Sequence, residues 1–134
     1  MTTVGRLLDT LGVSTAATFT DKIALGGPIG ERHIHMLHTP DWYSSSTVSV
    51  DHNFALSRDS FMIEKLAMMD TPREWMMFAG YSSWAPGQLE KEIAEGSWLT
   101  IAANPAIVFS SKKSQLWTIC VEIYGQTMID EFFA

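Results

Sequence analysis

The sequence has few of the features of a secreted or membrane-bound protein. Its single cysteine, Cys120, cannot form an intramolecular disulfide, which fits a reducing cytoplasmic compartment. No uncharged apolar run approaches the ~20 residues that a transmembrane helix needs. The residues after Met1 also lack the basic and apolar segments of a secretory signal. We therefore expect a cytoplasmic protein without a membrane partner.

Basic residues are scarce as well. The chain has 9 Lys and Arg against 15 Asp and Glu, which gives a formal net charge of -6. A polyanion is repelled by such a protein on average, so nucleic-acid binding would need a local basic patch. The only adjacent basic pair is Lys112-Lys113. The composition therefore argues against nucleic acid as a partner.

Apolar residues, in contrast, are plentiful. They make up 46% of the 134 residues and include five Trp, seven Phe and eight Met. This is enough apolar surface to offset the entropy of ordering the chain, which excludes disorder. The length is that of one domain with one core, so residues 1–134 are expected to form a single domain.

Hydrophobic periodicity predicts alternating helices and strands, and hence an α/β or α+β class. Helices are expected at 4–12, 59–69, 86–95 and 116–124, and strands at 23–25, 32–38, 47–50, 54–56, 75–80, 98–102 and 106–109. The run 75–80 follows helix-capping signals at Thr71 and Pro72, but it is too short for an average helix and is therefore assigned as a strand.

Three of these elements carry more specific expectations. In the second helix we expect Ser57 as N-cap and a buried face made of Phe61, Ile63, Leu66, Ala67 and Met69. In the third helix, Lys91 is placed to pair with Glu95. The last helix is expected to stop at Gly125, with an inward face made of Leu116, Trp117, Cys120, Val121 and Tyr124.

One block makes the chain recognisable. The run 80–93 reads GYSSWAPGQLEKEI and is followed by Trp98-Leu99, while GGPI stands upstream at 26–29 and Leu37-His38 lies nearby. On these motifs, in this order, the chain resembles the AlgH/YqgE family, also called UPF0301 or DUF179. The resemblance implies an α+β fold in which a mixed, curved, split sheet forms a partial barrel flanked by helices. It also brings the label of putative transcriptional regulator, which names no mechanism.

The chain departs from the family at two places. Ser82-Ser83 replaces the family's Ala-Gly before Trp84, and the several dozen residues that usually open the family have no counterpart here. A sheet without its first strands exposes an edge or an apolar face, and such edges pair with other chains. We therefore expect a homo-oligomer or a protein partner.

The block itself supplies the first candidate ligand-binding residues: Trp84, Gln88, Glu90 and Glu92. On a helix, Gln88 and Glu92 share one face while Glu90 points elsewhere. They could line a pocket at the start of that helix, where free N–H groups attract anions. The alternative is that they brace the turn, with Trp84 as a plug of the core.

The upstream motif supplies Gly26, Gly27, Pro28 and His38 as further candidates. A glycine-rich turn after a strand could hold a phosphate, but this one lacks the lysine of a P-loop and the spacing of a dinucleotide-binding motif. The alternative is a tight turn in which no side chain fits.

Histidines raise the question of a metal. His33 and His35 share one face of the strand at 32–38, where they could bind a metal with Asp51 or His52. A solvated strand face explains the same pattern. No cofactor is expected, and Cys120 lies on an apolar helix face that suits an inert thiol.

These observations favour a noncatalytic cytoplasmic protein that binds a protein or a small ligand. A transcriptional regulator is the first alternative, on the family label alone. The second is a hydrolase or metal-dependent enzyme that uses Glu90 and Glu92 or the histidines His33 and His35; it requires those side chains to converge in a cleft.

Overall fold

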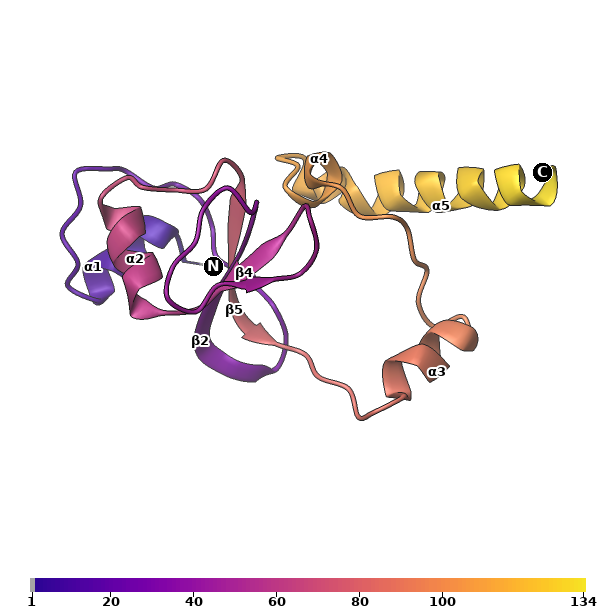
Figure 1. Cartoon of the computed structure of the whole chain (residues 1–134), viewed down its shortest axis with the longest axis horizontal. Helices are drawn as coiled ribbons and strands as arrows, with labels where there is room; N and C mark the ends of the chain where they lie inside the picture. The colour runs from indigo at the N-terminus through magenta and orange to yellow at the C-terminus, as the bar shows by residue number, and fades with distance from the viewer. Residues whose placement is uncertain (1) are drawn as a thin grey trace. The chain divides into compact units, whose positions relative to one another are not determined.

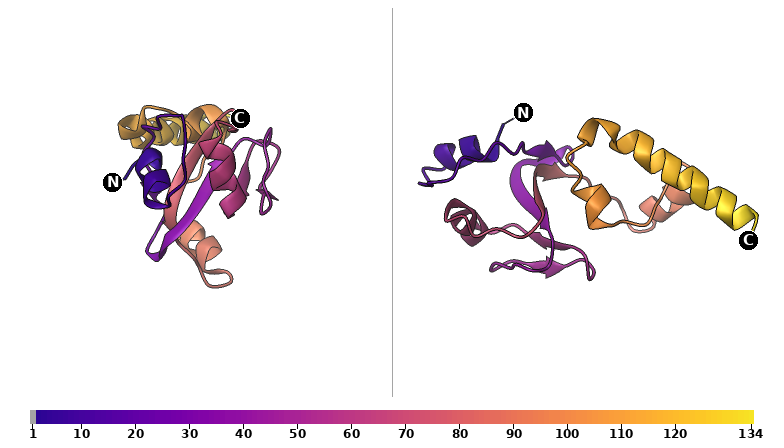
Figure 2. Two further views of the ribbon diagram at one scale, coloured as in Figure 1. Left: turned by 90° about the vertical axis from the view of Figure 1, so that its left-hand side faces the viewer. Right: turned by 90° about the horizontal axis from the view of Figure 1, so that it is seen from above.

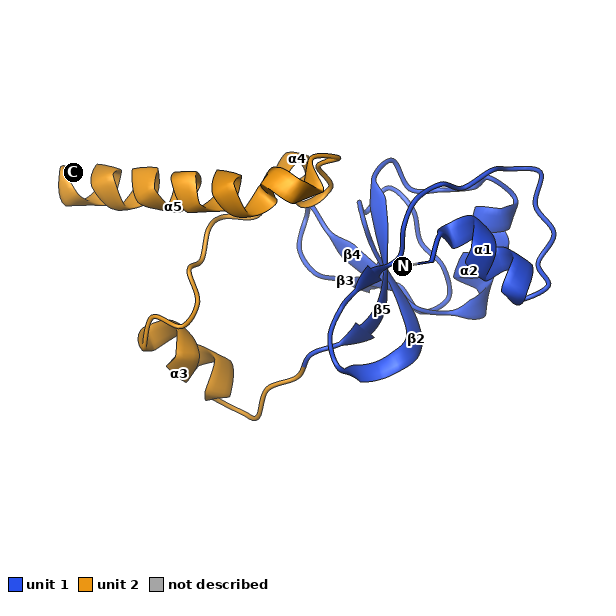
Figure 3. Cartoon of the chain, turned by 180° about the vertical axis from the view of Figure 1, so that it is seen from behind, with its two compact units in different colours: residues 1–82 blue, residues 83–134 orange. Residues whose placement is uncertain are grey.

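The structure, a computed structural model, describes residues 2–134 and divides into two compact units. Unit 1 is Met1–Ser82 and unit 2 is Ser83–Ala134, drawn in blue and orange in Figure 3. Each unit is treated by itself below, and the single domain expected from the length stays a prediction.

Unit 1 holds the sheet and two helices. Its elements are α1 (Val4–Thr10), β1 (Ala24–Leu25), β2 (Ile29–His38), β3 (Val48–Ser49), β4 (Ala55–Ser57), α2 (Ser60–Ala67) and β5 (Trp75–Tyr81). Unit 2 is helical, with α3 (Gln88–Ala94), α4 (Pro105–Val108), the 3-10 turn η1 (Lys113–Gln115) and α5 (Leu116–Phe132). The expected α+β class is confirmed. None of the helices among residues 2–134 has the length and apolar character that a bilayer span requires.

The sheet is mixed and open. Its five strands follow the order β1-β5-β2-β4-β3, in which β1 runs parallel to β5 and the other pairs are antiparallel. Val48 pairs with Leu56, so β3 and β4 form an antiparallel hairpin. Asp51 closes it, because its Oδ1 accepts the backbone N–H groups of Asn53 and Phe54.

The long strand β2 is paired unequally along its two edges. On one side, β5 pairs with Ile29 and then with Ile34–His38, with a register shift between them. On the other side, β4 pairs only with Met36–His38. The first half of β2 therefore has no strand neighbour on its β4 side.

Helices α1 and α2 lie side by side against one face of the sheet (Figures 1 and 2). Between them and the sheet, Met36 and Met77 are paired across β2 and β5 and are fully buried. The core around these two side chains consists of Val4, Leu8, Ile23, Trp42, Met62, Ile63, Leu66 and Ala67. At the start of α1, the hydroxyl of Thr3 accepts the N–H of Arg6 at 3.2 Å, as expected for an N-cap.

In α2, two expectations are wrong. The N-cap is Asp59, whose Oδ1 accepts the N–H of Met62 at 2.9 Å, because the hydroxyl of Ser57 is used elsewhere. The buried face contains Met62, whereas Phe61 and Met69 are exposed. The Phe61 ring instead lies 5.6 Å from the ammonium of Lys65, and Met69 lies beyond the helix with a φ of 65°.

Unit 2 departs from the expected strands. The segment 98–102 is irregular, and Asn104 caps α4 by accepting the N–H of Ile107 at 3.0 Å, so 106–109 is not a strand. Pro105 in the first helical position favours that helix. Lys91 lies 3.9 Å from Glu95, which confirms the expected pair, although α3 begins at Gln88 rather than at Pro86.

The last helix continues past Gly125 to Phe132, so the expected stop is wrong. A glycine inside a helix costs only about 1 kcal/mol, and good helix-forming residues follow it here. The expected inward face of α5 is also wrong at Trp117 and Val121, which are exposed; Cys120 is half-buried and free.

Candidate functional site

The carboxylate of Glu92 is the centre of a hydrogen-bonded cluster in unit 2. Its Oε2 accepts the indole N–H of Trp98 at 2.7 Å and that of Trp84 at 3.0 Å. Its Oε1 accepts the side-chain amide of Gln88 at 3.1 Å. The two indole rings meet edge to face with centroids 6.0 Å apart. Three donors around one carboxylate leave little of its hydrogen-bonding capacity for a ligand.

The start of α3 positions this cluster. Gly87 adopts a left-handed backbone with a φ of 77°, and the Oε1 of Gln88 accepts the N–H of Ala85 at 3.0 Å. Gln88 and Glu92 are four residues apart and share one helix face, as expected. Glu90 lies on another side of the helix, so the two carboxylates do not converge.

The hydrogen bonds also set the ionisation of Glu92. The N–H groups of Trp98 and Trp84 lower the pKa of Glu92 below its ordinary value of 4.5, and Gln88 adds to them against a small opposing effect of burial. Trp84 itself is 37% exposed, so its expected role as a core plug is wrong. Its indole N–H, rather than burial, holds it in place.

The Gly26-Gly27 turn packs against the end of β5. A side chain at Gly26 would collide with the carbonyl oxygen of Gly80, and one at Gly27 would collide with Tyr81 and the hydroxyl of Ser82. Gly27 also has a φ of 151°, which side-chain-bearing residues rarely adopt. The two motifs that carry the family resemblance therefore contact each other. This contact favours the tight-turn interpretation, and Pro28 follows the turn as an exposed residue before β2.

His38 is fully buried in unit 1, where a chain of hydrogen bonds fixes its tautomer. Its Nδ1 lies 2.8 Å from the carbonyl oxygen of Thr39 and must donate to it. The Nε2 atom then accepts the hydroxyl of Ser57 at 2.7 Å, and the Ser57 oxygen accepts the hydroxyl of Thr47 at 2.6 Å. The backbone N–H of Ser44 completes the chain by donating to Thr47 at 2.7 Å.

Asp59 anchors the same loop. Its Oδ2 accepts the hydroxyls of Ser44 and Ser46 and the N–H of Ser46, while Oδ1 caps α2. Burial alone would raise the pKa of Asp59, but the hydrogen bonds from Ser44 and Ser46 outweigh it and hold that pKa far below its ordinary value. Asp59 therefore stays ionised throughout the physiological range.

The Ser57–His38 pair has the spacing of a nucleophile and its general base, but not their access. Ser57 and His38 are both 0% exposed, so a substrate cannot reach the Ser57 oxygen in this conformation. His38 also packs edge to face on the ring of Trp42, with centroids 5.1 Å apart. The arrangement joins β2, β4 and the loop 39–47, which is a structural role.

A cavity of about 1130 Å³ lies in unit 1 along the unpaired half of β2. The four consecutive residues Arg32 to His35 of β2 line it. Neighbouring side chains of a strand point to opposite faces, and both sets border a cavity that follows the edge of the strand. Across from them, Arg58, Asp59 and Ser60 line the cavity between β4 and α2. Leu37, Leu56 and Phe78 supply an apolar wall, and Gly26 and Tyr81 lie at one end.

His35 is unusual within this cavity. Its Nε2 atom is shielded from solvent and has no hydrogen-bond partner, while its ring contacts Tyr81 edge to face at 5.9 Å. Burial, the positive charge of Arg58 and then His33 lower the pKa of His35. A neutral ring with one unsatisfied nitrogen costs stability unless another group pairs with it.

The expected metal pair gains no further ligands. His33 and His35 both line the cavity, but across residues 2–134 no three His, Cys, Asp or Glu side chains come together in a way that could hold an ion. Asp51 and His52, the possible third ligands, lie in the exposed turn of the β3–β4 hairpin.

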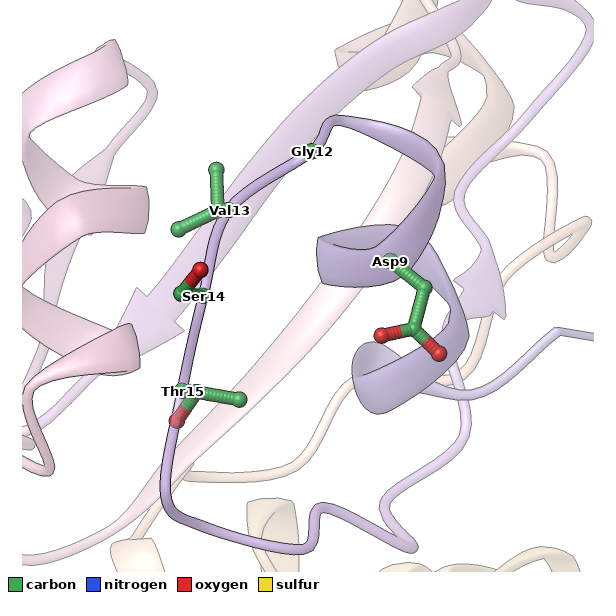
Figure 4. Close-up of a pocket in the computed structure, with 5 residues that line it drawn as sticks. All are labelled: Asp9, Gly12, Val13, Ser14 and Thr15. Carbon is green, nitrogen blue, oxygen red and sulfur yellow. The ribbon is translucent and has the colours of Figure 1, made fainter.

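A second, smaller pocket of about 380 Å³ lies where α1 ends (Figure 4). It is lined by Asp9, Gly12, Val13, Ser14 and Thr15. Its single charged group is Asp9, and the hydroxyl of Thr15 already donates to the carbonyl oxygen of Ala67. It therefore presents fewer binding groups than the cavity beside β2.

Comparisons with known proteins agree with the motifs. The profile of the AlgH-like family, DUF179, matches residues 1–128. The chain belongs to the AlgH-like family. A UPF0301 protein of Methylococcus capsulatus is 35% identical over 114 residues, which cover 85% of this chain and 63% of the relative. A UPF0301 protein of Proteus mirabilis is 34% identical over 83% of this chain and 59% of its own length. The chain thus spans about three fifths of these two relatives.

A solved structure extends the likeness to the fold. The solution structure of the AlgH protein from Pseudomonas aeruginosa superposes with a TM-score of 0.77 at 25% sequence identity. The match covers 92% of this AlgH-like chain and 67% of the Pseudomonas chain.

Sequence reasoning missed three contributors to these sites. Arg32 and Arg58 carried no motif, and Ser57 was assigned to a helix cap. The pairing of β2 with β4 explains why Arg58 belongs to the cavity. Met36 pairs with Ser57, so the next position along the two strands places Arg58 opposite His35. That register is not visible in the sequence, since the turn at 51–53 lacks the glycine that would define it.

The buried hydroxyl chain predicts the effect of removing Ser57. The substitution Ser57→Ala leaves the Nε2 atom of His38 buried without a partner, so it should lower the free energy of unfolding by about 1–3 kcal/mol in urea titrations. Ser45→Ala, at an exposed position of the same loop, is the matched control and should change little. Equal stability of the two variants would contradict the hydrogen-bond chain.

The Glu92 cluster predicts a pH dependence in unit 2. Because the folded pKa of Glu92 is depressed, its contribution to stability is present above the ordinary glutamate pKa and is lost as pH falls through the folded value. The indole N–H resonances of Trp84 and Trp98 should therefore titrate together below pH 4.5 in NMR spectra. Glu92→Gln should abolish this titration and Glu90→Gln should not. Indole resonances that still titrate in the Glu92→Gln variant would contradict the role of Glu92.

Proposed function

We propose that this AlgH-like chain is a noncatalytic binding protein and that its ligand occupies the cavity beside β2. The observation that carries the proposal is the combination of a volume of about 1130 Å³ with an apolar wall and a few polar groups, which is the usual make-up of ligand sites.

Catalysis has less support. Ser57 and His38, a nucleophile–base pair by spacing, are fully buried, and Glu92 is already held by three side-chain donors. Glu90 does not share a helix face with Glu92. Glu90 and Glu92 therefore do not converge in a cleft, and His33 and His35 gain no third ligand among residues 2–134.

The regulator role that the family label suggests also has little support. With a net charge of -6, the chain would need a basic stripe to bind a nucleic acid. Arg32 and Arg58 form a patch that matches a small anion better than a duplex. A cytoplasmic location, in line with the single cysteine and the bacterial relatives, is part of the proposal.

A homo-oligomer is the partner that we propose. The sheet ends on both sides in two-residue strands, β1 and β3. In β3 and directly after it, Val48 and Val50 are 63% and 60% exposed. An apolar edge of this kind favours pairing with a second copy.

Light scattering after size-exclusion chromatography tests the oligomer. Val50→Asp puts a charge at the β3 edge and should convert the oligomer to a monomer, whereas His52→Asp at the hairpin tip should not. A wild-type chain that elutes as a monomer would refute this part of the proposal.

The cavity is tested by fluorescence titration with N-phenyl-1-naphthylamine, a neutral dye, and 8-anilinonaphthalene-1-sulfonate, its anionic relative. We expect one dye molecule to bind per chain. Val48→Trp, at an exposed position of the cavity wall, should weaken binding by about tenfold or more by filling the mouth. His52→Trp, at the exposed hairpin tip and outside the lining, is the control. Absence of saturable binding, or equal affinities in both variants, would overturn the proposal.

A further inference from the structure

Four nitrogen-bearing side chains gather in the cavity of an otherwise acidic protein. Arg32, His33 and His35 come from β2, and Arg58 follows β4. They include two of the nine Lys and Arg side chains and two of the four histidines of the chain. The charges of the two arginines add up where low-dielectric walls confine their field.

No acid of the protein neutralises the two arginines. Among residues 2–134, the ion pairs join Lys65 to Asp70 and Lys91 to Glu95, and neither Arg32 nor Arg58 takes part in one. The only carboxylate on the cavity wall is Asp59, whose oxygens already accept four hydrogen bonds. The cavity therefore carries unpaired positive charge, which burial of a complementary anion would satisfy.

Part of the cavity wall is apolar. Leu37, Leu56 and Phe78 lie on the sheet face that α1 and α2 do not cover, with the side chain of Val48 at the rim. Each of the three is half-buried, so a ligand that covered them would remove further apolar surface from water. A cationic edge beside an apolar wall selects a molecule with one charged end and one apolar end.

We propose that the cavity binds an organic anion, with a carboxylate or phosphate head at Arg32 and Arg58 and an apolar body on Leu37, Leu56 and Phe78. This inference rests on the proposed function and names its ligand class. Ser60 and Tyr81 also line the cavity and bring hydroxyl groups to it, whereas the hydroxyl of Ser46 already donates to Asp59.

Binding should be coupled to the protonation of His35. In the free protein, burial, Arg58 and His33 all lower the pKa of His35. An anion among these groups offsets the repulsion and raises that pKa, so affinity should increase as pH falls from 7 toward 5.5. The charged and titratable groups around the ring are Arg32 and His33 on β2, Arg58, Asp59 at the α2 cap and Tyr81 on β5.

The test compares octyl phosphate, octanoate and 1-octanol as competitors of the neutral dye on the full chain. The two anions should compete at least about tenfold better than the alcohol. Arg58→Gln and Arg32→Gln should each weaken the anions by about tenfold while leaving 1-octanol unchanged. Arg6→Gln removes the same charge from α1, outside the cavity, and is the control. The order of octyl phosphate and octanoate distinguishes the two head groups.

Histidine NMR supplies an independent readout. The apparent pKa of His35 should rise on saturation with the better anion and stay unchanged with 1-octanol. If the alcohol competes as well as the anions and the arginine variants bind the anions with unchanged affinity, the proposed ligand class is wrong. A dye site that is weakened by Val48→Trp would then still support a binding protein. If no dye binds at all, both proposals fall.

Discussion

The rest of unit 1 depends on how β2 pairs with its two neighbours. Pairing with β5 brings Met36 beside Met77 and creates the apolar surface that α1 and α2 cover. Pairing with β4 stops at Met36, because the chain turns after Ser57 into the capped start of α2. Thus one strand provides the core on one face and, along its unpaired half, the edge of the cavity.

The loop after β2 shows how polar groups stabilise this arrangement. His38 and Ser57 are on paired strands, and a chain of hydrogen bonds links them to Thr47 and Ser44. Buried polar groups are costly without partners but specify one geometry when all of them are satisfied. Asp59 extends this order to the first turn of α2, and therefore to the wall that carries Arg58.

The residues that identify the family serve mainly structural roles in this chain. Glu92 holds Trp84 and Trp98 through their indole N–H groups, and the Gly26-Gly27 turn fits against Gly80 at the end of β5. By contrast, the groups that we propose for ligand binding, Arg32 and Arg58, lie outside these motifs. A strong motif can therefore mark a constraint of the backbone, while the proposed ligand site lies where unpaired charge and unfilled volume coincide.

Much of the fold could be predicted from the sequence. The long strand ending at His38, the hairpin around Asp51, the strand at 75–80 and the helices at 4–12 and 86–95 follow from periodicity and turn chemistry, which act over a few residues. The segment 98–109 could not be predicted, because short apolar runs suit strands and buried helices equally. Gly125 failed as a stop signal because glycine weakens a helix without ending it.

The sequence by itself determined the family, the long strand that ends at His38 and the sharing of one helix face by Gln88 and Glu92. Only the tertiary structure decided that Ser57 bonds to His38 rather than to a helix end, and that Arg58 lies near His35. The reason is that these relations depend on strand register. A register joins residues about twenty positions apart and is set by packing of the whole sheet rather than by local sequence.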